Sequence, residues 1–513
     1  MTRLHAPGII ARSLVAGTAV LIVVATRDGR SAAPRPAEAH EMVPRAAHAL
    51  RYLIPTAAFS GAPASLYTLE ERMGYYGVPG VSIAIINEGR IESVIAAGQR
   101  DASMGTPADT TTLFEAGSLS QPIAALTALR LAERGRLDLD ADVNRYLEQW
   151  TLPPSRFTLA HKVTPRRILS HTAGLTGWEL PTFAPGAPVP TLPELLSGSR
   201  RAGTLPLRND TIPGRRWLYS AGGYATLQQL LEDITDTPFP TLARRLTLTP
   251  LGMARTRFEY PLPPEHLTNM AAAHDALGRP MPIPRHVHPA TAATGLWTTA
   301  ADLARLAVAI QRSARGDASA PFSMGIASQL LTPDTALGLF GHRWGLGLAI
   351  AGRGPTERFT HAGRDDGFRS HLVAFRHTGQ GAVVLTNGQR GDALIQEILR
   401  AIATEYRWPA LQPVEVDTVP TDSATAFPLA GRYVNYVSGG DTAFVTLVWK
   451  NGRLGGVIAN EVRALWAQAD GRFTDPLTSD TFWAEYDELG HVVALGHVNL
   501  WQESIPRRLE RAP

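Results

Sequence analysis

Residues 114–140 read FEAGSLSQPIAALTALRLAERGRLDLD and carry the most informative local pattern of the chain. Ser118 stands just before a segment, at about 120–134, whose Ile, Leu and Ala residues cover most of a helical circumference, which predicts a buried helix. Pro122 falls in the first turn, where its missing N–H costs nothing, and Gly135 suits the position just after the last turn. A serine here is most simply a helix cap. It is also well placed as a nucleophile, because N–H groups at a helix N-terminus stabilise developing negative charge.

The chain around this helix shows both strand and helix patterns. Apolar runs at 81–86 and 91–96 flank the turn residues 87–90 (NEGR), which together predict a β-hairpin. Further strands are expected near 344–351, 368–376 and 381–387, and helices at 223–235, 239–247, 299–312 and 392–406.

The N-terminus has the pattern of an export signal. Arg3 and Arg12 precede an apolar run at 14–25, which has the length of a signal-peptide core and is short for a membrane span. We expect residues 1–25 to be a signal peptide and the protein to be periplasmic or secreted, with an uncleaved N-terminal membrane anchor as the alternative. Residues 26–48, rich in Ala, Pro, Arg and Glu, are typical of a linker.

The C-terminal part differs in character. Residues 409–427 are rich in Pro, Thr and Ala and predict a second linker. Residues 428–513 consist of short alternating segments separated by turns such as Lys450-Asn-Gly452, which predicts a small antiparallel barrel or sandwich.

Composition excludes several classes of function. The 513 residues are 44% hydrophobic and 19% charged with a net charge of +3, so the chain is globular. Basic residues do not cluster with aromatic ones, so nucleic acid is not an expected partner. The chain has no cysteine, which excludes disulfides and thiolate metal sites. His286-Val-His288 has no further ligand cluster beside it in the sequence and is interpreted as a loop pair, so we expect no metal and no cofactor.

The 114–140 segment and five later ones, in this order, resemble the β-lactamase and penicillin-binding-protein superfamily, which includes class C β-lactamases, D-aminopeptidases and esterases. The later segments are RILSHTAGL at 167–175, PGRRWLYSAGGY at 213–224, LGM at 251–253, TGLWTTAAD at 294–302, and HAG at 361–363 with GFRS at 367–370.

The resemblance implies a role for each matching position. Ser118 would be acylated, and Tyr219 would shuttle protons between Ser118, the leaving group and the deacylating water. An unperturbed phenol has a pKa of about 10, so it needs a cation nearby to act as a base. His361, in place of the usual lysine of the third motif, would add partial positive charge and a hydrogen-bond donor. The backbone N–H groups of Ser118 and Arg364 would form the oxyanion hole. Possible substrate-binding positions are Ala221, Gly363 and Asp365, the last of which is otherwise interpreted as part of a solvated turn.

One position departs from the family pattern. The first motif should read Ser-x-x-Lys, yet Gln121 stands three residues after Ser118. The chain has two lysines, Lys162 and Lys450, and neither follows a serine at that spacing. An amide neither titrates nor carries charge, so it replaces neither function of the lysine. Either Tyr219, with a histidine as its base partner, performs slower acyl transfer, or the site binds ligands without turnover.

The resemblance implies an α/β (α+β) fold with an antiparallel sheet flanked by helices and an all-helical region. The hydrolase domain would span 49–408, and the segment 428–513 resembles a lipocalin-like β-barrel. The implied function is an exported serine hydrolase that cleaves an amide or ester, first of all in small peptides. The alternatives are a β-lactamase or esterase, and a non-catalytic module that binds peptides or cell-wall fragments.

Overall fold

The computed structural model describes residues 44–512 except 55–56, 60–65, 178–179, 199–202, 260–261, 284, 335–341, 437–441, 459–460, 476–479 and 500–506. The predicted signal peptide at 1–25 and most of the predicted linker at 26–48 lie outside the described residues.

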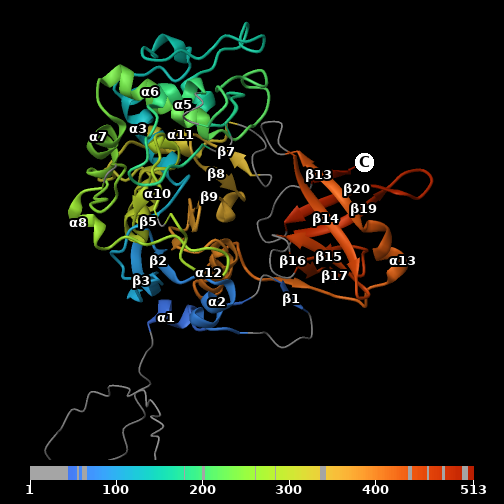
Figure 1. Ribbon diagram of the computed structural model, residues 1–513. Helices are drawn as coiled ribbons and strands as arrows, with labels where there is room; N and C mark the ends of the chain where they lie inside the picture. The colour runs from blue at the N-terminus through green and yellow to red at the C-terminus, as the bar shows by residue number, and fades with distance from the viewer. Residues whose placement is uncertain are drawn as a thin grey trace, which may run out of the picture. The chain divides into compact units, whose positions relative to one another are not determined.

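The larger part of the chain is built on an eight-stranded antiparallel sheet with the order β4-β3-β2-β11-β10-β9-β8-β7 (Figure 1). Its strands are β2 (Gly80–Asn87), β3 (Arg90–Asp101), β4 (Thr106–Pro107), β7 (Arg343–Trp344), β8 (Ala349–Ala351), β9 (Arg358–Asp365), β10 (Phe368–Phe375) and β11 (Gly381–Thr386). The predicted hairpin is present as β2 and β3. Glu88 and Gly89 between them both have positive φ, 52° and 72°, as a two-residue hairpin turn requires.

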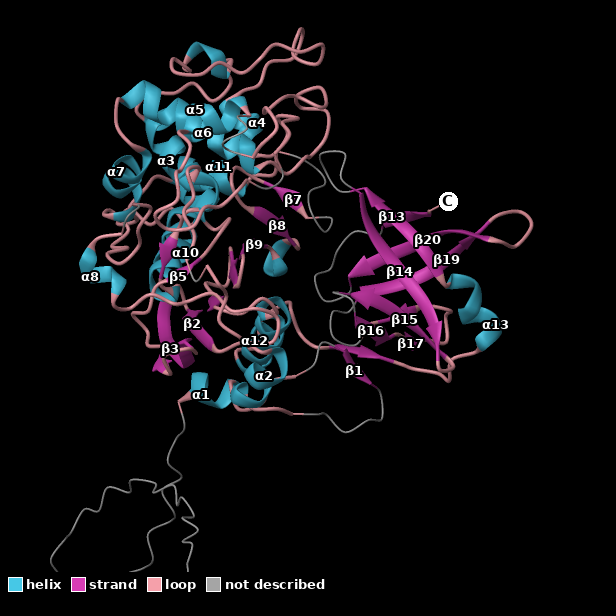
Figure 2. Cartoon of the chain, viewed as in Figure 1, coloured by secondary structure: helices cyan, strands magenta, loops and turns pink. Residues whose placement is uncertain are grey.

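Helices cover both faces of this sheet. On β2, Ile83 and Ile85 face one hydrophobic core and Ala84 and Ile86 face another, as the period of two in a strand dictates. The first core is closed by α1 (Arg45–Ala49), α2 (Leu69–Tyr76) and α12 (Gly391–Glu405), which lie together in Figure 2. The second core is closed by α10 (Ala300–Ala314).

A helical region surrounds α3 (Ser120–Glu133), the helix predicted from residues 120–134. Residues 120–129 of α3 are all buried. The neighbouring helices are α4 (Pro165–Leu169), α5 (Leu192–Ser197), α6 (Ala221–Thr235), α7 (Phe239–Ala243), α9 (Thr291–Thr294) and α11 (Met324–Leu331). The expected helix at 239–247 consists of α7 followed by a π-helical turn at Arg244–Leu248.

Nine strands between residues 431 and 511 form an antiparallel sheet with the order β16-β15-β14-β13-β21-β20-β19-β18-β17. Its strands are β13 (Gly431–Tyr436), β14 (Thr442–Lys450), β15 (Arg453–Ile458), β16 (Glu461–Ala464), β17 (Trp466–Ala467), β18 (Phe473–Thr474), β19 (Asp480–Tyr486), β20 (Val492–Asn499) and β21 (Arg507–Arg511). Because the edge strands β16 and β17 follow each other in the chain, the sheet is a nearly closed barrel. The two sheets and their helices confirm the predicted fold class, while the likeness to lipocalins stays a prediction.

The structure differs from the expected boundaries at two places. Helix α1 begins at Arg45, inside the expected linker, because Ala46 packs into the core. The expected linker at 409–427 contains β12 (Val414–Val416), which pairs in parallel with β1 (Ala57–Phe59). Among the described residues, no helix has both the length and the apolar character needed to cross a bilayer.

Candidate active site

Ser118 lies in a tight turn between β5 (Phe114–Glu115) and α3. Gly117 before it has a φ of +52°, and a Cβ atom there would lie 2.4 Å from the carbonyl oxygen of Arg364. Only glycine fits this position without strain. The turn is therefore held directly against β9, the strand that carries the third motif.

Three of the predicted site residues meet in one chain of hydrogen bonds. Tyr219 donates its phenolic hydrogen to Ser118 Oγ at 2.7 Å. Gln121 donates from Nε2 to Tyr219 Oη at 2.6 Å. Tyr219 itself is held by the start of α6, where the hydroxyl of Ser220 caps the helix by accepting from the N–H of Gly223 at 2.8 Å.

Gln121 occupies the place of the missing lysine. It lies in the first turn of α3, is fully buried, and points its amide nitrogen at Tyr219. Its Oε1 atom is buried without a hydrogen-bond partner. The amide thus positions the phenol and provides a neutral donor, with no charge to stabilise a phenolate.

His361 is placed differently from what the family resemblance implied. Its Nδ1 atom lies 2.8 Å from the carbonyl oxygen of Ala362, so Nδ1–H donates there, and Nε2 has no hydrogen-bond partner. Burial lowers the pKa of His361 to about 4. The imidazole of His361 is therefore neutral at neutral pH, and the prediction that it adds positive charge is wrong. Its Nε2 atom also makes no hydrogen bond to Tyr219.

His171 is a site residue that sequence reasoning did not single out. Its ring lies against that of Tyr219, with the ring centroids 4.4 Å apart. The backbone N–H of Ser220 donates to His171 Nδ1 at 3.2 Å, which leaves the hydrogen on Nε2. Burial, and then the nearby His361, hold the pKa of His171 well below its usual range. The signal in the sequence that could have identified His171 is its position in the segment 167–175, which resembles the family.

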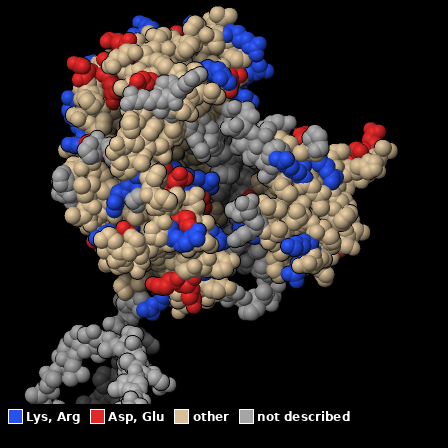
Figure 3. Space-filling view, in the orientation of Figure 1, with Lys and Arg blue, Asp and Glu red and all other residues tan. Residues whose placement is uncertain are grey.

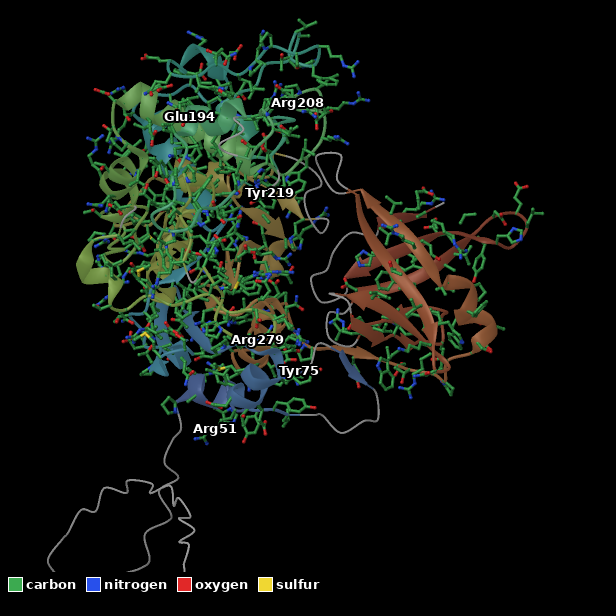
Figure 4. All side chains as sticks on the ribbon, viewed as in Figure 1. Arg51, Tyr75, Glu194, Arg208, Tyr219 and Arg279 are labelled. Atoms are coloured by element: carbon green, nitrogen blue, oxygen red, sulfur yellow. The ribbon has the colours of Figure 1, made fainter. Side chains whose placement is uncertain are left out.

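Aromatic rings line the same region. Trp344 lies with its ring centroid 5.1 Å from His171 and 5.6 Å from His361, and Trp217 lies 5.4 Å from Trp344. Tyr219 is labelled in Figure 4, close to β7, the strand that contains Trp344. The site is therefore apolar on one side and poor in charge.

The predicted oxyanion hole rests on close packing of backbone. A Cβ atom on Gly117 would lie 2.9 Å from the nitrogen of Arg364, so the backbone of Arg364 lies directly beside the nucleophile turn. A Cβ atom on Gly363 would lie 1.9 Å from the carbonyl oxygen of Ala116. Gly363 therefore allows the two backbones to approach each other. This close contact explains why a glycine is present here, without a role in substrate binding.

The surroundings of the two other predicted substrate-binding positions do not favour contact with substrate. Ala221 is the first residue of α6 and is buried. Asp365 is not in a solvated turn: its side chain is 6% exposed, and its Oδ2 lies 2.9 Å from His288 Nε2. His286 and His288 lie in a loop as interpreted, but they are not isolated there, because both are buried beside Glu115 and Asp365.

Charged side chains are dispersed over the face of the molecule that Figure 3 draws. Acidic and basic side chains alternate on the face drawn in Figure 3, without a large field of one sign.

Comparison with known proteins assigns the family. The Beta-lactamase family model matches residues 68–405, which is more than half of the chain. "Penicillin-binding protein 4" of Amycolatopsis lactamdurans is 27% identical over 378 residues, 69% of this chain and 93% of that protein. "Esterase EstB" of Burkholderia gladioli is 32% identical over 182 residues, 34% of this chain and 45% of that protein.

A solved structure extends the likeness. The octameric penicillin-binding protein homologue from Pyrococcus abyssi superimposes with a TM-score of 0.54 at 20% identity, covering 86% of this chain and 98% of that one. This structural likeness shows the fold alone. The family match rests on the sequence of residues 68–405. The chain therefore belongs to the Beta-lactamase family of serine hydrolases.

Proposed function

We propose that this protein is an exported serine hydrolase that cleaves an amide or ester bond through an acyl-enzyme on Ser118. The observation that carries the proposal is the hydrogen-bond chain from Gln121 Nε2 to Tyr219 Oη and on to Ser118 Oγ. It joins the nucleophile to a group that exchanges protons, which is the geometry that acyl transfer needs.

Each step of the reaction has a group in place. With Tyr219 ionised to the phenolate, Ser118 Oγ attacks the carbonyl carbon and its proton passes to Tyr219 Oη, 2.7 Å away. The backbone N–H groups of Ser118 and Arg364 receive the negative charge on the carbonyl oxygen. Tyr219 then protonates the leaving group, and water repeats the sequence in reverse to release the acid.

The neutral groups beside Tyr219 limit the rate of acylation. Before Tyr219 can accept the proton of Ser118, it must release its own phenolic proton to solvent and become a phenolate, and the donor beside it is the amide of Gln121. Hydrogen bonds from charged donors are about twice as strong as those between neutral groups. We therefore expect acylation that is slower than with a lysine at this position.

Substrate preference follows from the same chemistry. An alkoxide leaves more easily than an amide nitrogen, which must be protonated as it departs, so esters should react faster than peptides. Trp217, Trp344 and Tyr219 offer an aromatic surface for an apolar acyl group. Small peptides, esters and β-lactams are the substrate classes that we propose, in keeping with relatives described as a penicillin-binding protein and an esterase.

A second candidate function is a module that binds peptides or cell-wall fragments without turnover. The observation in its favour is Gln121, together with the two neutral histidines, because none of these groups supplies a positive charge.

Turnover assays separate the two candidates. Release of p-nitrophenol from short-chain esters and of p-nitroaniline from small peptides should be measurable and should vanish in Ser118→Ala. The matched control is Ser103→Ala, which removes an exposed hydroxyl and should leave the rate unchanged. Activity that persists in Ser118→Ala would refute the acyl-enzyme, and no activity with retained binding would support the module.

Export is proposed on the N-terminal sequence. Arg3 and Arg12 followed by the apolar run at 14–25 have the pattern of a cleavable signal. N-terminal sequencing of the mature protein from its native host should find a start near residue 26. An intact Met1 or an N-terminal anchor retained in the membrane fraction would contradict it.

A further inference from the structure

A second polar cluster lies directly behind the nucleophile turn. It consists of Glu115, His286, His288 and Asp365, which come from three separate parts of the chain. His286 and His288 project to the same side because they are two residues apart in the extended segment 286–288. Their side chains are 3% and 5% exposed, and those of Glu115 and Asp365 are 1% and 6% exposed.

The distances between the donor atoms fit one small cation. His286 Nδ1 lies 3.1 Å from Glu115 Oε2 and 3.9 Å from Asp365 Oδ1, and His288 Nε2 lies 2.9 Å from Asp365 Oδ2. One ligand atom each from Glu115, His288 and Asp365 can be chosen so that all lie within 4.8 Å of one another. Zinc bonds of about 2.0–2.1 Å in a tetrahedron place neighbouring ligand atoms about 3.3 Å apart.

The hydrogen bonds of the cluster leave ligand atoms unused. His288 Nε2 and Asp365 Oδ2 are buried and face each other, but they are not aligned for a hydrogen bond and neither has a hydrogen-bond partner. His288 Nδ1 lies 3.1 Å from Thr294 Oγ1. When Nδ1–H donates to Thr294, as a second hydrogen bond does for most histidine ligands of metals, Nε2 keeps its lone pair. Two lone pairs that meet in a buried place repel each other unless a cation, either a proton or a metal ion, lies between them.

We propose that Glu115, His288 and Asp365, with His286 as the fourth donor, bind one divalent transition-metal ion of the zinc type. Imidazole nitrogens and carboxylate oxygens are ligands of zinc, and a dication balances the two buried carboxylates. Two imidazolium–carboxylate pairs without metal are the competing arrangement.

The site has a positioning role for the reaction proposed above. Glu115 ends β5 three residues before Ser118, and Asp365 ends β9 directly after Arg364. An ion shared by these two carboxylates ties the strand that leads to the nucleophile to the strand that provides the second N–H group of the oxyanion hole. The ion has no step in the chemistry, because it acts only through the positions of these two strands.

Metal content tests the proposal without reference to activity. The full chain is produced with zinc in the medium, desalted, and analysed by inductively coupled plasma mass spectrometry. It is then stripped with dipicolinate and titrated with Zn²⁺ while Tm is followed, and with Co²⁺ while the visible absorption of tetrahedral cobalt is followed. We expect one equivalent of metal, a rise in Tm with Zn²⁺, and cobalt bands in the visible range.

Variants locate the ion. His288→Gln and Asp365→Asn should each weaken Zn²⁺ binding at least 100-fold and abolish the cobalt bands. The matched control is His377→Gln, which changes a histidine that is 53% exposed and should bind as the wild type does. Thr294→Val removes only the second hydrogen bond of His288 and should weaken binding about 10-fold to 100-fold, so it serves if the ligand variants do not fold.

Three results would overturn the proposal. The first is wild-type protein with less than one tenth of an equivalent of any first-row metal and no change of Tm in Zn²⁺. The second is equal Zn²⁺ affinity in His288→Gln and wild type, which would place the ion elsewhere. The third is cobalt absorption typical of an octahedral ion bound to water.

Discussion

Restoring the family's lysine provides the sharpest test of how Ser118 is deprotonated. In Gln121→Lys, the ammonium nitrogen would replace Nε2, which lies 2.6 Å from Tyr219 Oη. At about 3 Å and an effective dielectric constant of about 20, an ammonium stabilises a phenolate by about 5–6 kcal/mol. Because Gln121 is fully buried, desolvation of the new cation takes back several kcal/mol of this gain.

The net stabilisation of the Tyr219 phenolate that remains should raise the rate of acylation. General-base assistance is worth typically about 10²-fold to 10⁴-fold, so we expect the acylation rate constant of Gln121→Lys to rise by about that factor. Stopped-flow release of p-nitrophenol in the first turnover measures this step apart from deacylation. Gln121→Met, which keeps the size and removes the donor, is the matched control and should be slower than the wild type.

The reasoning about Gln121 fails if the lysine variant folds normally and acylates no faster than the wild type. Circular dichroism and Tm decide whether it folds. A slower reaction in folded Gln121→Lys would show that a group other than Tyr219 has become the base and that the amide is part of that arrangement.

Three further predictions concern the same protein. Tyr219→Phe should lower kcat for esters by about 10²-fold to 10⁴-fold with little change of Tm, and a rate within about threefold of wild type would remove Tyr219 from the proton path. His361 has a pKa of about 4 in the folded chain and about 6.5 when unfolded, so the unfolded chain binds more protons between these values. Its contribution to stability should rise by up to about 3 kcal/mol as pH rises from 4 to 6.5, and urea unfolding at several pH values should show that His361→Gln loses this contribution while that of His171, whose pKa is also lowered, remains. Glu397 accepts two hydrogen bonds of 2.7 Å from buried Arg72, so Glu397→Ala should cost about 3–5 kcal/mol in urea unfolding; a loss below about 1 kcal/mol, or one as small as that of exposed Glu133→Ala, would contradict the buried ion pair.

Local patterns made much of the fold predictable. Residues 120–134 carry an apolar helical pattern that leaves no polar face, and α3 is buried accordingly. The NEGR turn predicts the hairpin of β2 and β3 because Gly89 adopts positive φ without strain. Ser118 and Gln121 share one side of a helical turn, so their proximity follows from their spacing.

The electrostatics of the site could not be predicted in the same way. The charge of His361 depends on burial, and burial results from packing against Trp344, a residue seventeen positions away on another strand. The partners of His288 are distant in sequence: Asp365 comes from β9, and Glu115 from β5. No local pattern indicates that these segments meet, so the sequence predicted a loop pair without acidic partners.

The identity of the nucleophile can be tested in one measurement. The wild type and Ser118→Ala are incubated with a fluorophosphonate, their intact masses are recorded, and the modified peptide is sequenced by tandem mass spectrometry. We predict a single adduct on Ser118 in the wild type and an unmodified mass for Ser118→Ala. An adduct on another residue, or equal labelling of Ser118→Ala, would contradict the assignment of Ser118 as the acylated residue.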